Sequence, residues 1–434
     1  MRNKQYILLL LFAVFIITAC SDNDKDDPPQ NMETELSILV LSDLHYFDPD
    51  LGAGETAFYY DKMSDAKLAD ISKYITEAYF EAISQNPANT LIITGDLTCN
   101  GETYNHEKVI EFLKKCGKRV FVIPGNHDIN SPFAYRYEGS QQTKIATPTA
   151  EEFARMYADF GFKQAFSRDV NSLSYAANLD SHFVLLALDV CRYEENTATT
   201  AISGGHLKIE TLKWISEVLE SVYAGNKQAI VAMHHGLIEH FPGQMLNPVT
   251  SNYLLDNATD LINILNKYGV HCVLTGHFHA NDIVKFGGTD LYDIETGSAL
   301  TYPHSWREIT LSKNKIKVQT FDITHISHST SPAEFVQYSI EKSSTALYNY
   351  FNKIWKSSGL SVPDSIELQL HNEFAKAILA HYHGDEQISP KTEAFAQELI
   401  SSGNTKLAAI GYALRGVYTD PAPADRNTEI IFND

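Results

Sequence analysis

The sequence predicts an α/β domain followed by a smaller region built from helices alone. Between residues 36 and about 325, short runs of β-branched and apolar residues alternate with amphipathic stretches of helical period. Beyond residue 330 the strand pattern stops, and apolar residues recur at helical spacing. The first 35 residues fit neither pattern and are typical of a targeting segment and a tether.

Length and composition limit the classes of protein to which the chain can belong. The chain has 434 residues, enough for two or three domains, and its 44% hydrophobic content excludes a disordered chain. Lys and Arg number 34 against 54 Asp and Glu, a net charge of −20. A chain this acidic repels polyanions, so general nucleic-acid binding is disfavoured. A small phosphorylated substrate stays compatible if cations occupy the site.

The N-terminus carries the marks of an export signal. Basic residues precede an apolar run over 7–17, which is too short to cross a bilayer because a span takes about 20 residues. The sequence from Ile17 to Cys20 resembles the lipobox of bacterial lipoproteins. That resemblance implies removal of residues 1–19, lipidation of Cys20 and an extracytoplasmic, membrane-anchored location, periplasmic or on the cell surface. A plain signal peptide with an incidental cysteine is the alternative. The polar residues 20–35 are expected to form a flexible tether.

Four other cysteines remain, and their pairing is open. They could form disulfides outside the cytoplasm with three possible connectivities, and none shows the CxxC spacing of a thiolate zinc site. These are Cys99, Cys116, Cys191 and Cys272.

The α/β part, expected over 36–325, contains eight clear strand patterns and five helix patterns. The strands are short and rich in Val, Ile and Leu, and the last two are expected to be antiparallel edge strands. The helices show one apolar face, and Thr149 and Glu152 form a capping box before one of them. Strands are expected at 37–41, 90–94, 120–123, 183–188, 229–233, 270–274, 307–311 and 315–320, and helices at 66–84, 106–116, 153–160, 209–223 and 258–268.

The helical domain is expected over 326–418. Ser331, Pro332 and Glu334 form a helix start, with an N-cap, a proline at the first position and an acid at the third. Helices follow at 335–356, 366–382 and 391–401, which predicts a small bundle. The proline-rich residues 419–434 are expected to be a loose tail or to lie across the body of the protein.

Residues that can bind metal follow five of the predicted strands. In open α/β sheets ligands bind beyond the carboxyl ends of the strands, so these clusters should converge on one cleft. Carboxylate, amide oxygen and imidazole are ligands that transition metals accept. Each cluster alone is a common turn sequence, and the ordered set of five carries the inference. The clusters are Asp43-Leu44-His45, Gly95-Asp96, Gly125-Asn126-His127-Asp128, His234-His235 and Gly276-His277-Phe278-His279.

This ordered set is similar to the pattern of the calcineurin-like metallophosphoesterase family, over about residues 36–310. The resemblance implies an αββα sandwich, in addition to the C-terminal helical bundle, and two metal ions, either Mn, Fe or Zn. It implies that one ion takes Asp43, His45 and His279, the other takes Asn126, His234 and His277, and Asp96 bridges them. In the family's pattern the ligand is the first residue after the strand, which here is His234 rather than His235.

The resemblance also implies a reaction. A metal-bridging hydroxide would attack a phosphodiester. His127 would protonate the leaving oxygen or hydrogen-bond the pentacovalent phosphorus, with Asp128 orienting it, and a purely structural role next to the metal ligands is the alternative for His127. The whole chain further resembles bacterial cyclic-nucleotide phosphodiesterase-like lipoproteins with a helical C-terminal domain. Tyr46, Tyr302 and His304 are candidate substrate contacts, with packing of the cleft wall as the alternative for Tyr46.

The prediction is therefore a di-metal phosphoesterase acting on phosphodiesters, with cyclic nucleotides as candidate substrates. A phosphomonoesterase or nucleotidase with the same metal site is one alternative. A lipid-anchored, non-catalytic binding protein is the other, although all seven expected ligands are present. The metal, the physiological ester and the oligomeric state are left open. One further histidine, His106, is expected to cap a helix at the surface.

Overall fold

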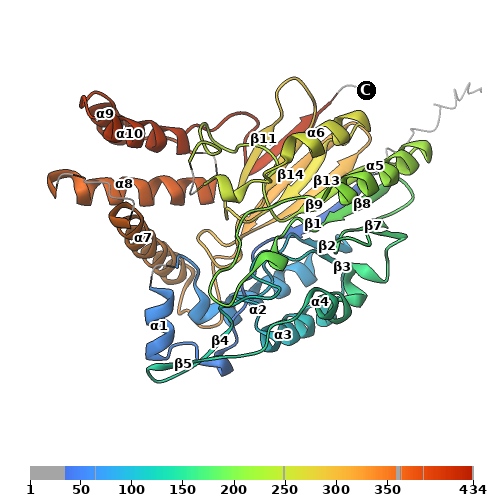
Figure 1. Ribbon diagram of the computed structural model, residues 1–434, viewed down its shortest axis with the longest axis horizontal. Coiled ribbons are helices and arrows are strands. Elements are labelled where there is room, and N and C mark those ends of the chain that lie inside the picture. The colour runs from blue at the N-terminus through green and yellow to red at the C-terminus, as the bar shows by residue number, and fades with distance from the viewer. Residues whose placement is uncertain are drawn as a thin grey trace, which may run out of the picture. The chain divides into compact units, whose positions relative to one another are not determined.

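Two β-sheets form the centre of the structure (Figure 1). The structure is a computed structural model that describes residues 35–63, 65–247, 250–357, 362, 364–384 and 386–432. The predicted signal over 1–19, the lipidation site Cys20 and the tether up to residue 34 lie outside the described residues.

The first sheet has six strands in the order β15-β14-β13-β1-β2-β3. Strands β1, β2 and β3 run parallel, while β13, β14 and β15 continue the sheet in antiparallel pairs from β1 outward. Strands β13 and β14 are antiparallel as predicted, but both are internal, so the prediction of edge strands at 307–311 and 315–320 was wrong. The strands are β1 (Leu36–Leu41), β2 (Thr90–Ile93), β3 (Arg119–Val122), β13 (Ser305–Ser312), β14 (Lys315–Asp322) and β15 (Asn427–Ile431).

The second sheet has seven strands in the order β11-β12-β10-β9-β8-β7-β6. Its central strands β8, β9, β10 and β12 are parallel, and antiparallel strands flank them. The strands are β6 (Ser167–Arg168), β7 (Tyr175–Asn178), β8 (Phe183–Leu188), β9 (Gln228–Met233), β10 (Cys272–Thr275), β11 (Asp282–Lys285) and β12 (Tyr292–Glu295); a separate hairpin joins β4 (Tyr135–Glu138) and β5 (Gln141–Lys144).

Helices cover the outer faces of both sheets, which confirms the predicted αββα sandwich. Alternate residues of a strand point to opposite faces. On β8, Leu185 contributes to the core shared with the first sheet, while Val184 and Leu186 pack with α5 and α6. Helices α2 and α3 pack on the first sheet. The helices of this part are α1 (Thr56–Lys62), α2 (Ser72–Gln85), α3 (Thr103–Lys115), α4 (Ala150–Met156), α5 (Ile209–Ala224) and α6 (Ala258–Lys267).

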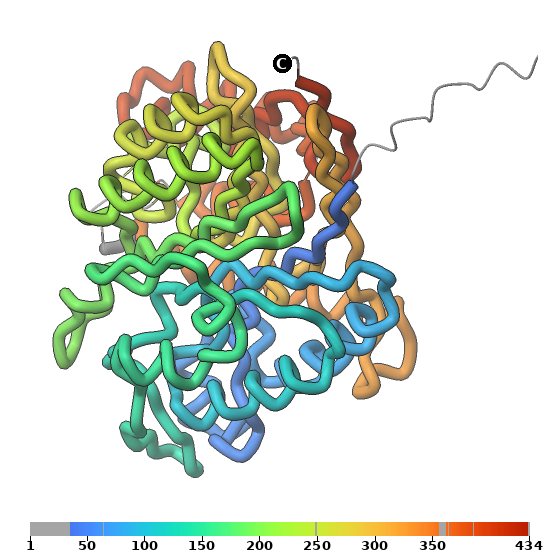
Figure 2. The backbone as a smooth tube through the Cα atoms, turned by 90° about the vertical axis from the view of Figure 1, so that its right-hand side faces the viewer, coloured from blue at the N-terminus to red at the C-terminus, as the bar shows by residue number. Residues whose placement is uncertain are grey.

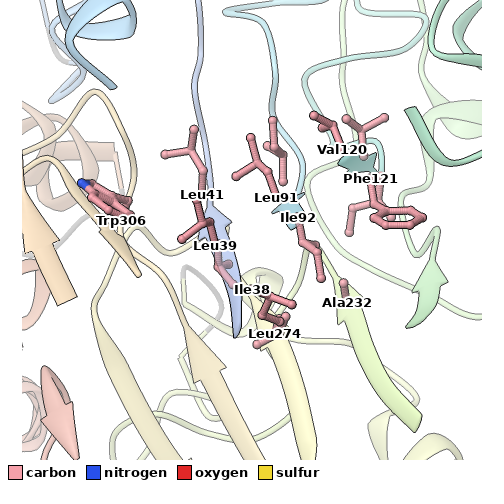
Figure 3. Packing of buried hydrophobic residues seen from close by; sticks show 14 of the residues in the cluster. Ile38, Leu39, Leu41, Leu91, Ile92, Val120, Phe121, Ala232, Leu274 and Trp306 are labelled. Carbon is pink, nitrogen blue, oxygen red and sulfur yellow. The ribbon is translucent and has the colours of Figure 1, made fainter. Parts of the chain in front are cut away.

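Side chains from both sheets fill the space between them (Figure 3). Ile38 and Ile92 of the first sheet belong to one buried cluster with Ala232 and Leu274 of the second. Burying this much apolar surface supplies the main driving force for the sandwich. It also holds the carboxyl ends of the parallel strands of both sheets at fixed positions.

The C-terminal helices form a group of their own, as predicted (Figure 1). Their apolar core also includes Phe241 and Phe278 from loops of the α/β part. The helices therefore share a core with the α/β part. The helices are α7 (Pro332–Ser357), α8 (Asp364–His383), α9 (Pro390–Ile400) and α10 (Thr405–Val417).

The end of the chain is a strand of the first sheet rather than a loose tail. Strand β15 pairs antiparallel with β14, and Figure 2 shows this dark red segment beside the orange strands. Ile430 faces the buried cluster that contains Ile316 and Val318. The proline-rich start of the segment suggested a tail, but the following apolar pair supplies a pairing surface that sequence alone did not reveal.

Two further predictions have clear outcomes. The four cysteines are free thiols, so none of the three connectivities is formed. Among the described residues, no helix combines the length and apolar character needed to cross a bilayer. The apolar run over 7–17 lies outside them.

The two neighbouring isoleucines of β15 provide a test of this sheet. Ile430 is 4% exposed and Ile431 is 65% exposed. We expect Ile430→Ala to lower the free energy of unfolding by about 2–4 kcal/mol because it leaves a cavity in the core. Ile431→Ala is the matched control and should change it by less than about 0.5 kcal/mol. Urea denaturation of both variants makes the comparison, and equally small effects would contradict the pairing of β15.

Candidate metal centre

The loops that follow the parallel strands of both sheets meet at one place. The His277 amide donates to Asp43 Oδ2 over 3.0 Å, which ties the loop after β10 to the loop after β1. The His234 ring donates from Nδ1 to the Thr94 carbonyl over 2.8 Å, which ties the loop after β9 to β2. The predicted convergence of the five motifs is therefore present in the structure.

The backbone at this junction adopts a left-handed conformation at five polar residues. Their φ values lie between 40° and 74°, and they make up five of the eight non-glycine residues with positive φ among the described residues. Such a conformation costs about 1–2 kcal/mol for each residue, so it persists only where other interactions hold it. The five are Asp43, His45, Asp96, His277 and His279.

The glycines of the motifs allow the loops to approach one another. A Cβ on Gly125 would lie 2.0 Å from Asp96 Oδ1, and one on Gly95 would lie 2.6 Å from His234 Nδ1. Both distances are far below van der Waals contact. A side chain at either position would push the candidate ligands apart, which explains why glycine occupies these positions.

The first group of candidate ligands consists of Asp43, His45 and His279. Asp43 Oδ1 lies 3.5 Å from His45 Nε2 and 3.4 Å from His279 Nε2, and the two nitrogens are 3.1 Å apart. Ligands about 2.1 Å from one ion lie about 3.0–3.5 Å from each other. Asp43 Oδ1 is buried and has no hydrogen-bond partner. The spacing and the unpartnered oxygen fit a bound cation.

The second group consists of Asp96, Asn126, His234 and His277. His234 Nε2 lies 3.3 Å from Asp96 Oδ2 and 3.1 Å from Asn126 Oδ1. Donor atoms of Asp96, His234 and His277 all lie within 4.8 Å of one another. The Thr94 carbonyl holds the proton of His234 on Nδ1, so the lone pair of Nε2 points into the group.

Asp96 lies between the two groups. Its Oδ2 is 3.3 Å from His234 Nε2 of the second group and 3.6 Å from His45 Nε2 of the first. Its other oxygen accepts a hydrogen bond of 2.8 Å from the His127 amide. One carboxylate oxygen therefore faces both groups, as a bridging ligand must.

The side chain of the adjacent His235 makes its hydrogen bond outside both groups of candidate ligands. Its Nε2 donates to the Ser203 carbonyl over 2.7 Å, and its ring lies against Gly205. His234 is the member of the pair that lies in the second group, in agreement with the predicted register.

Burial and mutual charge set the ionisation of the site. Burial opposes ionisation of both carboxyls, yet neighbouring imidazoles hold the pKa of Asp43 and Asp96 well below the usual value. Burial lowers the pKa of His45 to about 3 and that of His277 well below normal, so both imidazoles are neutral at pH 7. Against its own burial, His234 has its pKa raised to about 9 by the Asp96 carboxylate, so a bound cation would take the place of the proton on its Nε2. Ionised carboxylates and neutral imidazoles are the forms that bind metal.

The donor set therefore fits two divalent cations. Carboxylate, amide oxygen and imidazole are present in both groups together, and Asp43 Oδ1 lacks any other partner. Transition metals such as Mn, Fe and Zn accept these donors, so the donor set does not choose among them.

His127 lies at the edge of the site, while Asp128 has a different role from the predicted one. His127 Nδ1 donates to the Cys99 carbonyl over 2.8 Å, and Nε2 lies 4.0 Å from Asp96 Oδ2. Asp128 does not orient this ring. Its carboxylate accepts hydrogen bonds from the backbone amides of Gly125, Leu97 and Thr98 at 2.9–3.1 Å. Asp128 thus holds together the loops that carry Asp96 and Asn126.

Of the three predicted substrate contacts, Tyr46 and His304 face away from any open surface. Tyr46 is buried, and its hydroxyl donates to Asp48 over 2.7 Å. His304 is buried between the Ala299 carbonyl and the Ser339 hydroxyl, at 2.9 and 2.6 Å. Tyr46 therefore follows the packing alternative, and the prediction for His304 was wrong, because polar side chains after a strand can satisfy their hydrogen bonds inside the core.

The remaining contact, Tyr302, is half-buried and stacks on His383, with ring centroids 6.1 Å apart. It makes no contact with either group of candidate ligands among those the structure describes. His106, expected at the surface, is buried. Its Nδ1 lies 2.8 Å from the Tyr157 hydroxyl, and its Nε2 donates to the Asp128 carbonyl over 3.0 Å.

Sequence reasoning missed a groove beside the site. Its volume is about 580 Å³, and Lys62, Lys67 and Lys342 line it together with Tyr59 and Tyr60. Burial and then the charge of Lys67 lower the pKa of His45, and Lys67 also lowers the pKa of His127. This lysine therefore lies within electrostatic reach of the candidate ligands. No motif surrounds these lysines, so only the folded chain places them here.

Comparisons with known proteins agree with the geometry. A family model described as "Calcineurin-like phosphoesterase" matches residues 36–281, more than half of the chain. A Coxiella burnetii protein named "Probable cyclic nucleotide phosphodiesterase" is 27% identical over 216 residues, which cover 48% of this chain and 68% of that protein. A 3′,5′-cyclic adenosine monophosphate phosphodiesterase of Haemophilus influenzae is 24% identical over 288 residues, covering 63% of this chain and 86% of that protein. A solved dimetal phosphatase from Danio rerio matches with a TM-score of 0.47 and 14% identity, over 66% of this chain and 96% of that one.

The position of Asp96 between the groups leads to a test. We expect Asp96→Ala to bind two fewer equivalents of metal than the wild-type chain, because both groups lose a shared oxygen. Asp189→Asn is the matched control, since Asp189 is equally buried but bonds to Leu173 and Tyr193. Metal content by mass spectrometry and folding by circular dichroism are measured together. A folded Asp96→Ala variant with full metal content would contradict the bridging position.

Proposed function

The chain belongs to the calcineurin-like phosphoesterase family, and we propose that it hydrolyses phosphodiesters of nucleotide-like compounds, cyclic nucleotides among them. The observation that carries the proposal is the single oxygen, Asp96 Oδ2, that faces both groups of candidate ligands. Two cations held side by side are what hydrolysis of a phosphodiester requires, because the anionic ester repels a nucleophile.

Each group of residues has a distinct task in this proposal. When bound, two divalent cations would screen the charge of the phosphate and make a water acidic enough to attack it near neutral pH. Asp43, His45 and His279 would hold one cation, and Asn126, His234 and His277 the other, with Asp96 shared. Asp128 positions the loops of Asp96 and Asn126 through backbone amides.

The groove beside the site supports a nucleotide-like substrate. The aromatic rings of Tyr59 and Tyr60 offer surfaces for a base or sugar. The lysines give the groove no net positive charge, because Asp65, Asp70 and Glu341 line it as well, and Lys67 and Lys342 pair with Asp65 and Asp70 at 3.4 and 3.3 Å. The names of the two bacterial relatives also favour a cyclic nucleotide. At 24–27% identity the relatives support the class of substrate rather than one compound.

His127 is suited to protonate the leaving oxygen. The Cys99 carbonyl fixes Nδ1, so Nε2 is the nitrogen that points toward Asp96. The side chain is 29% exposed and can therefore meet a substrate, unlike the buried Asp96. A sugar alkoxide is a poor leaving group. In its doubly protonated form His127 would give the Nε2 proton to that oxygen, which departs as an alcohol, and the ring would be left neutral with its proton on Nδ1.

This role predicts a dependence on the leaving group. We expect His127→Ala to lower kcat/KM by about 10²–10⁴ with a cyclic nucleotide, and much less with a nitrophenyl diester, because nitrophenolate leaves unaided. The measurement is kcat/KM for both substrates in both proteins, with metal content determined alongside. Equal losses on the two substrates would exclude the proton donor and leave His127 as part of the metal site.

A substrate panel tests the function itself. The metal-loaded protein is assayed with cyclic nucleotides, an aryl phosphodiester and an aryl phosphomonoester. Faster hydrolysis of the diesters is expected. A preference for the monoester would indicate a phosphatase or nucleotidase, and binding without hydrolysis of any ester would indicate a binding protein.

We also propose that the protein is a membrane-anchored lipoprotein that acts outside the cytoplasm. The support is the sequence from Ile17 to Cys20 behind a short apolar run. We expect Cys20→Ser to release the protein from the membrane fraction, because firm anchoring takes more than one acyl chain. Intact-mass analysis of membrane-extracted wild type should show the added acyl chains. An unmodified Cys20 there would refute the anchor.

A further inference from the structure

A second cluster of buried ionisable side chains lies outside the candidate metal centre. Asp282 begins β11, His381 is near the end of α8, and Glu386 follows that helix. His240 comes from the loop after β9. All four are more than nine-tenths buried, with exposed fractions of 3%, 1%, 7% and 1%. None of them belongs to either group of candidate ligands in the metal centre.

The donor atoms of three of these residues converge. Ligand atoms of Asp282, His381 and Glu386 all lie within 4.8 Å of one another. His381 Nδ1 is 3.7 Å from Asp282 Oδ2 and in contact with Glu386 Oε1. His240 Nδ1 approaches the same Asp282 oxygen to 3.5 Å. Two side chains at the end of α8 and one at the start of β11 therefore present their polar atoms to one point.

Several of these atoms have no hydrogen-bond partner. Asp282 Oδ1 and Glu386 Oε2 are buried and unpartnered, as are both ring nitrogens of His240. A buried polar atom without a partner costs about 1–3 kcal/mol, and more when it is charged. Unpartnered oxygens on two carboxylates at one point indicate an absent positive group.

We propose that Asp282, His381 and Glu386 bind a third divalent transition-metal ion with a structural role. An imidazole beside two carboxylates favours Zn, Mn or Fe over Mg or Ca, which prefer oxygen ligands alone. The ion joins the end of α8 to the first residue of β11. It goes beyond the proposed hydrolysis, because these residues contact neither group of catalytic ligands.

The ion would also stabilise the loop that carries His277 and His279. Glu295, beside His240, accepts a hydrogen bond of 3.1 Å from the Ala280 amide, next to His279. Phe278, in the same loop, packs edge-on against His381 with ring centroids 5.2 Å apart. An ion at this point thus connects the helical region to the loop that carries His277 and His279.

Metal content in matched variants tests the proposal. We expect Glu386→Gln to bind one equivalent less metal than the wild-type chain. Glu373→Gln is the control, because Glu373 is equally buried on α8 but bonds to Thr392 and Lys376. It should keep the full content. A folded Glu386→Gln variant with unchanged metal content would overturn the third site.

If Glu386→Gln fails to fold, a second measurement on a different variant still tests the proposal. The double variant Asp43→Asn/Asp96→Asn weakens both catalytic groups and should retain one tightly bound equivalent after dialysis. Anomalous diffraction from crystals grown with Zn²⁺ should place that ion between Asp282, His381 and Glu386. No anomalous peak there would show that the imidazoles, as protonated cations, balance the carboxylates, and would refute the proposal. If the wild-type chain retains this ion but hydrolyses no ester, the third metal site stands and the proposed hydrolysis fails.

Discussion

The rest of the structure depends on two carboxylates, those of Asp43 and Asp96, which are buried at the junction of the sheets. Neither is more than 1% exposed, and a buried carboxylate is stable only with positive charge and hydrogen bonds around it. The surrounding imidazoles and backbone amides supply part of this compensation, and the unpartnered Asp43 Oδ1 points to metal for the remainder. The strained backbone and the closely approaching glycines follow from the need to bring loops of both sheets to the same two carboxylates.

The helical region takes part in this arrangement instead of being appended to it. Phe278 lies between two candidate ligands in sequence, yet its side chain belongs to the core of α7 to α10. The same loop is held from the other side by Glu295 through the Ala280 amide. The C-terminal strand β15 then returns to the first sheet beyond these helices. The helical region therefore packs directly against the loop that carries His277 and His279.

Sequence reasoning was most accurate where a pattern reports directly on a physical requirement. Runs of β-branched residues located eight strands to within a few residues, because buried parallel strands need apolar side chains on both faces. The ordered motifs identified the ligands that the structure brings together. It failed for His304, which satisfies its hydrogen bonds in the core. It also misplaced Asp128, because a carboxylate beside a histidine can bond to backbone amides instead.

The order of motifs along the chain was enough to predict that five clusters meet at one cleft, and the family resemblance of that order implied the αββα sandwich, the two groups of candidate ligands and the choice of His234. Side chains at the carboxyl ends of parallel strands must meet once the sheet forms. Tertiary structure alone decided that Asp128 bonds to the backbone amides of Leu97 and Thr98, and that the charge of Lys67 acts on the pKa of His45. It also decided that Asp282, His381 and Glu386 share one buried point. These contacts join segments far apart in sequence, and their geometry depends on packing, which no local pattern encodes.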